Sequence, residues 1–410
     1  MLRLAIAGCG AMSRRHVLGL DRLRDVDRAS FHLVAVCDPV PENAAALADL
    51  AGRTLGMRPR AFPSLEAIEA ACAVDALDLT TAPALHPGLA REAFAAGWHV
   101  LVEKPIALTV RDGREMIAAA RQADRVLAVA ENYRRDPINR LARALLDAGA
   151  IGLPYLAMQT FSAWGERVII TPWRHRQAAG GIAIDMGVHY ADILEYLLGP
   201  IQHVVGMGAL VDPVRVAPDG SQVIADAEDL TVGVARFASG ALASWTLDLA
   251  GRGAELYTRR IHGTSGTLTV PNDRTGQPLA MTVTRNGAPC TVSPVDQLAS
   301  IPDFTLDATT AALFSGERLA SYDLPWTDID ANLLAIELDD FARAISTGDA
   351  PEVSGEMGLR SLAIAYGFLE SERAGRILTV EEILDGRVTP YQDAIEAMLA
   401  ESVLRRADAG

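Results

Sequence analysis

The stretch that decides the fold is LRLAIAGCGAMS, residues 2–13, at the start of the chain. Its first six residues form a mostly apolar run, which is typical of a short buried strand. Gly8 and Gly10 follow, and a helix is expected from about residue 11 to 23. In such a unit the first glycine permits a tight turn, and the second lets backbone approach a pyrophosphate at the helix N-terminus. Ser13 stands where a third glycine usually follows, and the motif alone is equally consistent with a bare glycine turn.

The end of the second expected strand strengthens the dinucleotide interpretation. FHLVAVCD, residues 31–38, is typical of a strand that ends in Asp38. An acidic side chain at this tip can bind both ribose hydroxyls of an adenosine, and its charge would repel a 2′-phosphate. Pro39 offers no cation to compensate, although Arg14 and Arg15 are nearby, and Asp38 could also be an ordinary turn residue. The pattern predicts a dinucleotide site that prefers NAD to NADP.

The pattern of strands and helices divides the chain into three parts. Further apolar strands over 76–82, 98–104 and 126–132 alternate with amphipathic helices, which predicts a parallel sheet with helices on both faces. From about residue 155 the strands are longer, with hairpin-like breaks, and helices follow over 332–345 and 357–371, of which we expect the latter to brace the first domain. We expect a loop over 207–228. The predicted fold is α/β, with a Rossmann domain at 1–132, an α+β domain at 133–378 with a large, open, mostly antiparallel sheet, and a helical extension at 379–410.

Composition limits the classes of function. The 410 residues are too many for one ordinary core, and half of them are hydrophobic. A formal net charge of −15 argues against nonspecific nucleic-acid binding and against anionic membrane surfaces. The four cysteines are scattered without metal-type spacing, the first residues show no leader, and no run approaches the roughly 18 apolar residues of a transmembrane helix. We expect a cytoplasmic protein with a small-molecule partner.

Two further motifs carry chemistry. WHVLVEKP, residues 98–105, places Lys104 at the end of a parallel strand, where open α/β sheets bind their ligands. A lysine there can stabilise an alkoxide as hydride leaves its carbon, although it could also be a structural lysine. If GGIAIDMGVHYAD, residues 180–192, is helical, Asp185, His189 and Asp192 share one face and can move a proton. Such a pair is also common as a surface or capping contact. A third metal ligand with recognisable spacing is missing, so we expect no metal.

These motifs together resemble the Gfo/Idh/MocA oxidoreductases, which include glucose–fructose oxidoreductase and inositol 2-dehydrogenase. AIAGCGAM, VAVCDP, TAPALH, GWHVLVEKPIALT, GGIAIDMGVHYADILEYLLG and the closing SGEMGLRSLAIAYGFLESERAGRIL occur in the family's order across nearly the whole chain. The resemblance implies that Lys104, Asp185 and His189 are the catalytic set, with histidine as general acid/base and lysine polarising the same oxygen. It also implies an often cis bond before Pro105, and a homodimer or homotetramer formed through the open sheet.

The resemblance extends to the residues around the catalytic set. Two departures from the family's pattern are Ser13 and Ala82, where a proline commonly follows the threonine. Substrate contacts are expected from Tyr133 and Arg174. The implied cofactor contacts are Gly8, Gly10, Ala11, Met12, Asp38, Thr81, His86, Glu103, Lys104 and Asn132.

The expected function is transfer of hydride between NAD(P), with NAD preferred, and a carbinol carbon of a polyhydroxylated compound: a sugar, sugar acid, cyclitol or cyclic diol. One alternative is a redox-assisted glycosidase or lyase that retains NAD and re-reduces its product. A non-catalytic NAD sensor is a third possibility, but it would be expected to lack the lysine or the histidine, and both are present.

Overall fold

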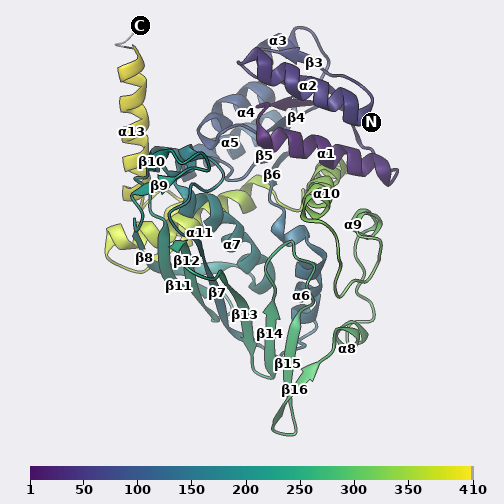
Figure 1. Ribbon diagram of the computed structural model, residues 1–410, viewed down its shortest axis with the longest axis vertical. Helices are drawn as coiled ribbons and strands as arrows, with labels where there is room; N and C mark the ends of the chain where they lie inside the picture. Colours follow the sequence, from purple (N-terminus) through teal and green to yellow (C-terminus); the bar gives the residue numbers. More distant parts are fainter. Residues whose placement is uncertain (408–410) are drawn as a thin grey trace.

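The computed structural model describes residues 1–407, with side chains described as far as residue 400. Its first domain is a six-stranded parallel sheet in the order β3-β2-β1-β4-β5-β6. Helices cover both faces of this sheet (Figure 1). The strands are β1 (Leu2–Ala7), β2 (Phe31–Cys37), β3 (Arg60–Phe62), β4 (Ala76–Leu79), β5 (His99–Glu103) and β6 (Leu127–Ala130). The helices are α1 (Ala11–Asp25), α2 (Pro41–Leu55), α3 (Leu65–Glu69), α4 (His86–Ala95) and α5 (Val110–Ala123), with the short 3₁₀ turn η1 (Pro83–Leu85).

This arrangement confirms the predicted Rossmann fold. Most residues of the sheet strands are apolar because helices cover both sides, and β4, β5 and β6 are buried almost throughout. All carboxyl ends lie at one edge of the sheet because the strands are parallel. The strand order reverses between β1 and β4, so a crevice for ligands is expected outside that edge.

The second domain is built on a nine-stranded sheet in the order β16-β15-β14-β13-β7-β12-β11-β8-β17. Among the described residues, every neighbouring pair in it is antiparallel except β7 and β12, as predicted. Its strands are β7 (Pro154–Trp164), β8 (Ile201–Ala209), β11 (Leu230–Phe237), β12 (Leu242–Gly251), β13 (Leu256–Gly263), β14 (Gly266–Val270), β15 (Ala280–Arg285), β16 (Ala288–Val292) and β17 (Leu378–Thr379).

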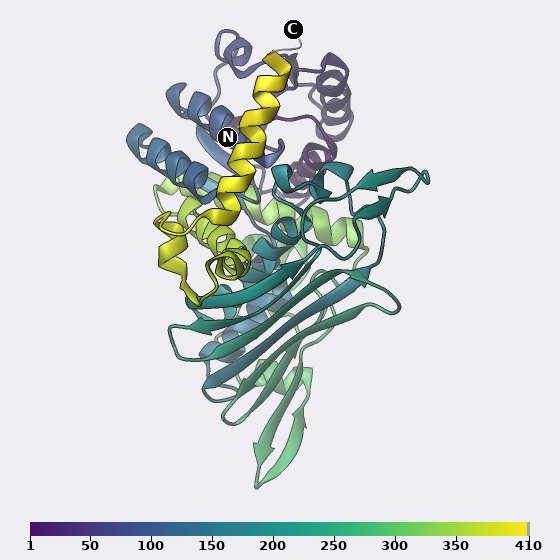
Figure 2. The same ribbon diagram turned by 90° about the vertical axis from the view of Figure 1, so that its left-hand side faces the viewer.

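One face of the large sheet is packed and the other is open. Along β7, Ala157, Gln159 and Phe161 are buried, whereas the side chains between them are more exposed. The buried face meets α7 (Ile182–Leu198) and α11 (Gly355–Ala374). Phe368 of α11 packs so closely on Gly233 that a Cβ there would lie 2.4 Å from its ring. The open face is turned toward the viewer in Figure 2.

The C-terminal helices connect the two domains. α10 (Trp326–Thr347) packs along α1, and its Ile329, Leu333 and Phe341 join the core of the first domain. α11, the helix expected to brace the first domain, contacts α5 as well as α7. The first domain therefore contains an element that the chain supplies some 200 residues after its last strand.

The remaining elements are short. Residues 207–228 were expected to be a loop, and this is wrong in part: β8 continues to Ala209, and β9 (Val214–Val216) pairs with β10 (Gln222–Ile224). Strands of three residues are too short to show a period in the sequence. α13 (Pro390–Ala407) stands out from the body beside the first domain (Figures 1 and 2), and residues 408–410 of the expected extension lie outside the described residues. The others are α6 (Pro137–Asp147), α8 (Pro294–Ala299), α9 (Ala308–Leu313), α12 (Val380–Leu384), η2 (Tyr133–Arg135), η3 (Pro172–His175) and η4 (Gln177–Ala179).

Candidate active site

The glycine turn after β1 has room for a ligand. Gly8 has a φ of +89°, and a Cβ on it would lie 2.7 Å from Cγ2 of Thr81, so this position requires glycine. Gly10 precedes α1, and a Cβ on it would meet no atom of the described chain within 4 Å. The first N–H groups of α1 therefore have open space beside them, as an anion site at a helix N-terminus needs.

Three side chains complete this end of the sheet. The Asp38 carboxylate accepts hydrogen bonds from the backbone N–H of Cys9 (2.9 Å) and of Val40 (2.9 Å), so it fixes the glycine turn. Ser13, in place of the third glycine, is buried and donates to the carbonyl of Gly10 at 2.9 Å. The hydroxyl of Thr81 is buried without a hydrogen-bond partner among the described residues. A free hydroxyl beside an open glycine turn fits a bound dinucleotide.

Lys104 lies directly after β5 and meets the first of three polar residues on α7. Its Nζ donates to the backbone carbonyl of Asp185 (2.9 Å) and to Oδ1 of the same residue (3.1 Å). The other carboxylate oxygen accepts a hydrogen bond of 3.1 Å from Nε of Arg174, which lies in η3. Burial would raise the pKa of Asp185, but the two cations lower it. The peptide bond between Lys104 and Pro105 is cis, as expected.

His189 lies one helical turn further along α7 and meets a different strand end. Its Nδ1 is 2.9 Å and 2.7 Å from the two carboxylate oxygens of Glu131, which follows β6. The backbone N–H of Tyr133 donates to the same carboxylate at 3.0 Å. The Tyr133 ring stacks on the imidazole with centroids 4.2 Å apart and planes 6° from parallel. Tyr133, an expected substrate contact, thus lies against the catalytic histidine candidate, and its contact with a substrate stays a prediction.

Asp192, the third polar residue of this helix face, does not join the other two. It pairs with Arg134 through two short hydrogen bonds, of which Nε to Oδ2 is 2.8 Å, and both side chains are buried. The sequence pattern placed these three residues on one face correctly. Each pairs separately with a residue that follows β5 or β6, so Asp185 and His189 do not hydrogen-bond each other.

Other residues expected to contact a cofactor already have protein partners. Both ring nitrogens of His86 face backbone carbonyls, those of Ile106 (3.2 Å) and Thr81 (3.1 Å). The Glu103 carboxylate lies 3.0 Å from Nε2 of the buried His16. Asn132 accepts a hydrogen bond from Arg274 at 2.7 Å. Ala11 and Met12 form the first turn of α1. Their contacts with a cofactor stay predictions.

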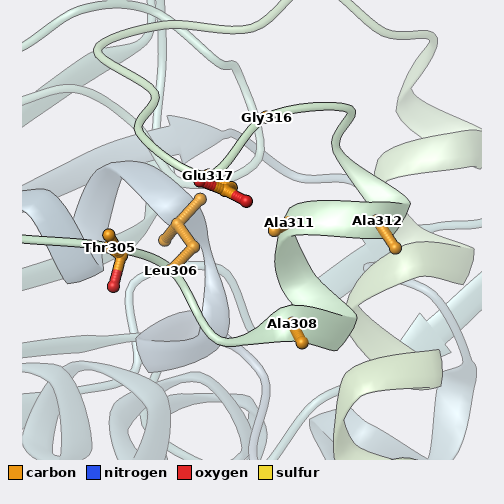
Figure 3. Close-up of a pocket in the computed structure, with 7 residues that line it drawn as sticks. All are labelled: Thr305, Leu306, Ala308, Ala311, Ala312, Gly316 and Glu317. Carbon is orange, nitrogen blue, oxygen red and sulfur yellow. The ribbon is translucent and has the colours of Figure 1, made fainter.

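The molecule has a small cavity at the site and a larger hollow elsewhere. A small cavity at the site is lined by Pro83, Pro105, Trp173 and Asp185, among others. A larger surface hollow of about 510 Å³ lies around α9 and the segment before it, where small alanine side chains predominate and Glu317 is the one charged group that Figure 3 labels. None of the predicted site residues lines it.

Two features of the site escaped the sequence analysis. Glu131 directly follows a buried strand, as Lys104 does one strand earlier, and this shared position was the signal that could have identified it. Lys104 is also the only lysine in the sequence, in which Lys and Arg total 37. All the other residues in that total are arginines. The one side-chain amine of the protein therefore lies where the ends of β5 and β6 meet α7.

The fold and this edge of the sheet define a dinucleotide-binding protein of the Rossmann type. The parallel strands have the Rossmann order, and their carboxyl edge carries a glycine turn, an acidic strand tip and a free hydroxyl. Comparison with known proteins agrees. Residues 2–131 match the family profile described as "Oxidoreductase family, NAD-binding Rossmann fold", and residues 139–269 match "GFO/IDH/MocA C-terminal domain". The chain belongs to the Gfo/Idh/MocA family and is an NAD(P)-dependent dehydrogenase or reductase, as the resemblance implied.

Several relatives cover almost the whole chain. It is 28% identical to D-apiose dehydrogenase of Paraburkholderia graminis, over 92% of this chain and 90% of that one. It is also 28% identical to 1,5-anhydro-D-fructose reductase of Ensifer adhaerens, over 93% and 99%. A solved structure of levoglucosan dehydrogenase with NADH and L-sorbose shares the fold, with a TM-score of 0.74 at 24% identity over 93% and 99%. None of the helices in the described part combines the length and apolar character that crossing a bilayer requires.

Proposed function

We propose that the protein transfers hydride between NAD and a carbinol carbon of a sugar, sugar acid, cyclitol or cyclic diol. The observation that carries this proposal is the convergence of Lys104 and His189 at the carboxyl ends of β5 and β6, the edge that also carries the glycine turn. Both full-length relatives are named for sugar chemistry, one as a dehydrogenase and one as a reductase, which supports the substrate class.

The residues at the glycine turn fit NAD. The open space at Gly10 and the free hydroxyl of Thr81 suit a pyrophosphate and its neighbouring groups. Asp38 lies at the tip of β2 with a negative charge that suits a ribose diol and repels a 2′-phosphate, so we infer NAD rather than NADP. When bound, the nicotinamide supplies the acceptor or donor of the hydride.

Lys104 is the proposed electrophile. Its ammonium group has three N–H donors, and Asp185 accepts two of them through its carbonyl and its carboxylate. The third is available for the oxygen of the substrate, where it stabilises the negative charge that develops as the carbon–hydrogen bond breaks. Arg174 holds the other oxygen of Asp185, so the carboxylate that orients the lysine is itself fixed.

His189 is the proposed general acid/base. Burial lowers the pKa of His189, and the charge of Lys104 lowers it further, while Glu131 raises it. The net direction is downward, so the imidazole is neutral near pH 7 and its Nε2 can accept a proton. In alcohol oxidation the hydroxyl proton passes to Nε2, and in carbonyl reduction it returns. Tyr133 and Arg174 lie at this site and are the proposed substrate contacts.

We also propose a homodimer or homotetramer in the cytoplasm. The open face of the large sheet exposes apolar side chains on the adjacent strands β8 and β11: Met207 (67% exposed), Val232 (47%) and Val234 (44%). An exposed apolar cluster of this kind suits contact with a second copy. The four cysteines are unpaired, which fits a reducing compartment.

The experiment is an absorbance assay of the purified protein with NAD, or with NADP, against a panel of sugars, sugar acids, cyclitols and cyclic diols. We expect at least one compound to be oxidised with NAD and more slowly with NADP. A panel-wide failure, in protein shown by calorimetry to bind NADH, would contradict the proposed substrate class.

A further inference from the structure

We propose that Glu131 is a positioning residue that sets the tautomer and the basicity of His189. The inference deepens the proposed function and rests on it for the role of His189. The sequence pattern offers two carboxylates of the same helix, Asp185 and Asp192, to this chemistry, and the family resemblance assigns Asp185. In the structure the Asp185 carboxylate hydrogen-bonds Lys104, whereas the Glu131 carboxylate hydrogen-bonds His189.

The geometry fixes the tautomer. Both oxygens of Glu131 lie within 2.9 Å of Nδ1, and an ionised carboxylate can only accept hydrogen bonds. Nδ1 must therefore carry the proton, and the neutral ring keeps its lone pair on Nε2. The Glu131 and His189 side chains are 4% and 5% exposed, so water does not compete for this contact.

Tyr133 locks the pair in place. Its backbone N–H donates to Glu131 at 3.0 Å, and its ring lies parallel to the imidazole at 4.2 Å. The imidazole therefore cannot flip to present the other nitrogen without displacing this ring. Arg274 lies on the ring of Tyr133, 5.2 Å from its centroid, which holds the tyrosine in turn. One short segment after β6 thus supplies both the acceptor and the platform for the histidine.

The charges around the imidazole define what Glu131 contributes. Lys104 after β5 and Arg274 after β14 oppose a positive charge on His189, while Asp185 on the same helix is neutralised by Lys104 and Arg174. The negative charge of Glu131 is then what favours the protonated form of His189. Burial would raise the pKa of Glu131, but the facing imidazole lowers it to about 2, so the carboxylate stays ionised. It raises the basicity of Nε2 and stabilises the charge that forms when the hydroxyl proton arrives.

Glu131→Gln tests this role because the amide keeps the shape of the side chain and removes its charge. For alcohol oxidation we expect kcat to fall on the order of 10²-fold, with KM nearly unchanged. The acid limb of the pH profile should move to lower pH by about one unit or more, because a nearby opposite charge has been lost. Glu131→Asp should recover part of the rate. Asp192→Asn is the matched control: Asp192 is a buried carboxylate on the same face of α7 as His189, but it pairs with Arg134, so its loss should leave the limb in place.

A second measurement needs neither substrate nor cofactor. ¹⁵N-histidine NMR of the free protein, with His189→Gln to identify the signal, should show Nδ1 protonated and Nε2 unprotonated at neutral pH. In Glu131→Gln the midpoint of this titration should fall. An unchanged tautomer and midpoint would overturn the inference, even if the protein proved to be a dehydrogenase. A shifted midpoint with an unmoved acid limb of the rate would equally overturn it, because the pairing would then have no role in turnover.

Discussion

Replacing Lys104 by methionine perturbs the proposed electrophile while keeping most of its volume. The change removes both hydrogen bonds that the ammonium makes to Asp185. Asp185 keeps Arg174 at 3.1 Å, so its buried charge is not left alone. The free energy of unfolding should therefore fall by about 1–3 kcal/mol, which is typical of lost hydrogen bonds to a charged group, rather than the roughly 3–5 kcal/mol of an orphaned buried ion.

The effect on catalysis should be larger than the effect on stability. Losing a single donor to a developing oxyanion lowers the rate by roughly 10²–10³, or about 2.7–4 kcal/mol of transition-state stabilisation. We expect kcat/KM to fall by this amount while NADH affinity, measured by fluorescence titration, changes little. Lys104→Arg should also lose most activity, because a planar guanidinium cannot place its donors as the ammonium does.

The composition offers an independent check. Since Lys104 is the only lysine, reductive methylation with ¹³C-formaldehyde labels one side-chain amine, and its signal should shift when a substrate analogue binds. Urea unfolding and steady-state kinetics on the two variants complete the assay. Near-normal kcat/KM in Lys104→Met, with the expected loss of stability, would refute the reasoning and leave the lysine a structural role.

Three further predictions concern other parts of the molecule. Gly10→Ala should leave the unfolding temperature unchanged, because a Cβ there meets no described atom, yet it should weaken NADH binding in a fluorescence titration; Gly8→Ala, where φ is +89°, should lower the unfolding temperature as well. Asp38→Asn should weaken binding of NAD more than of NADP, as the ratio of kcat/KM values would show, and an unchanged ratio would remove Asp38 from cofactor choice. Glu337 of α10 is wholly buried, with neither oxygen hydrogen-bonded in the described chain and with Nε2 of His16 3.9 Å from Oε1, and burial raises its pKa from 4.5 to about 8. The native state then holds a proton that the unfolded chain releases between these values, so stability should fall as pH rises through this window. Glu337→Gln should remove that slope and stabilise the protein at about pH 9 by roughly 1–3 kcal/mol, measured by urea unfolding; equal stability of the two proteins there would contradict it.

The first domain could be predicted because its signals are local. Apolar runs, glycine turns and helix periods each occupy a few residues, so the alternation of strands and helices and the glycine turn at Gly8 and Gly10 were visible in the sequence. The packing of α10 on α1 was not, because it joins residues about 300 positions apart through ordinary amphipathic surfaces. Helical periodicity shows that a face is buried but does not show against what.

The positions of the site residues along the chain could be predicted in the same way, but their contacts could not. The spacing of Asp185, His189 and Asp192 correctly placed them on one helix face. Their partners depend on how α7 docks against the ends of β5 and β6, which the spacing does not contain. The contact between Glu131 and His189 spans 58 residues, and the position of Glu131 directly after a buried strand does not show which residue it meets.

The measurement that tests the central claim most directly is the stoichiometry of turnover. Purified protein, checked for retained nicotinamide, is mixed with free NAD and the substrate that the panel identifies, and NADH and product are quantified together. The account predicts equimolar NADH and carbonyl product in the wild type, and formation of both slowed by roughly 10²–10³-fold in Lys104→Met. Substrate consumed without net NADH, by protein that retains its cofactor, would contradict the dehydrogenase assignment and indicate transient oxidation followed by elimination and re-reduction.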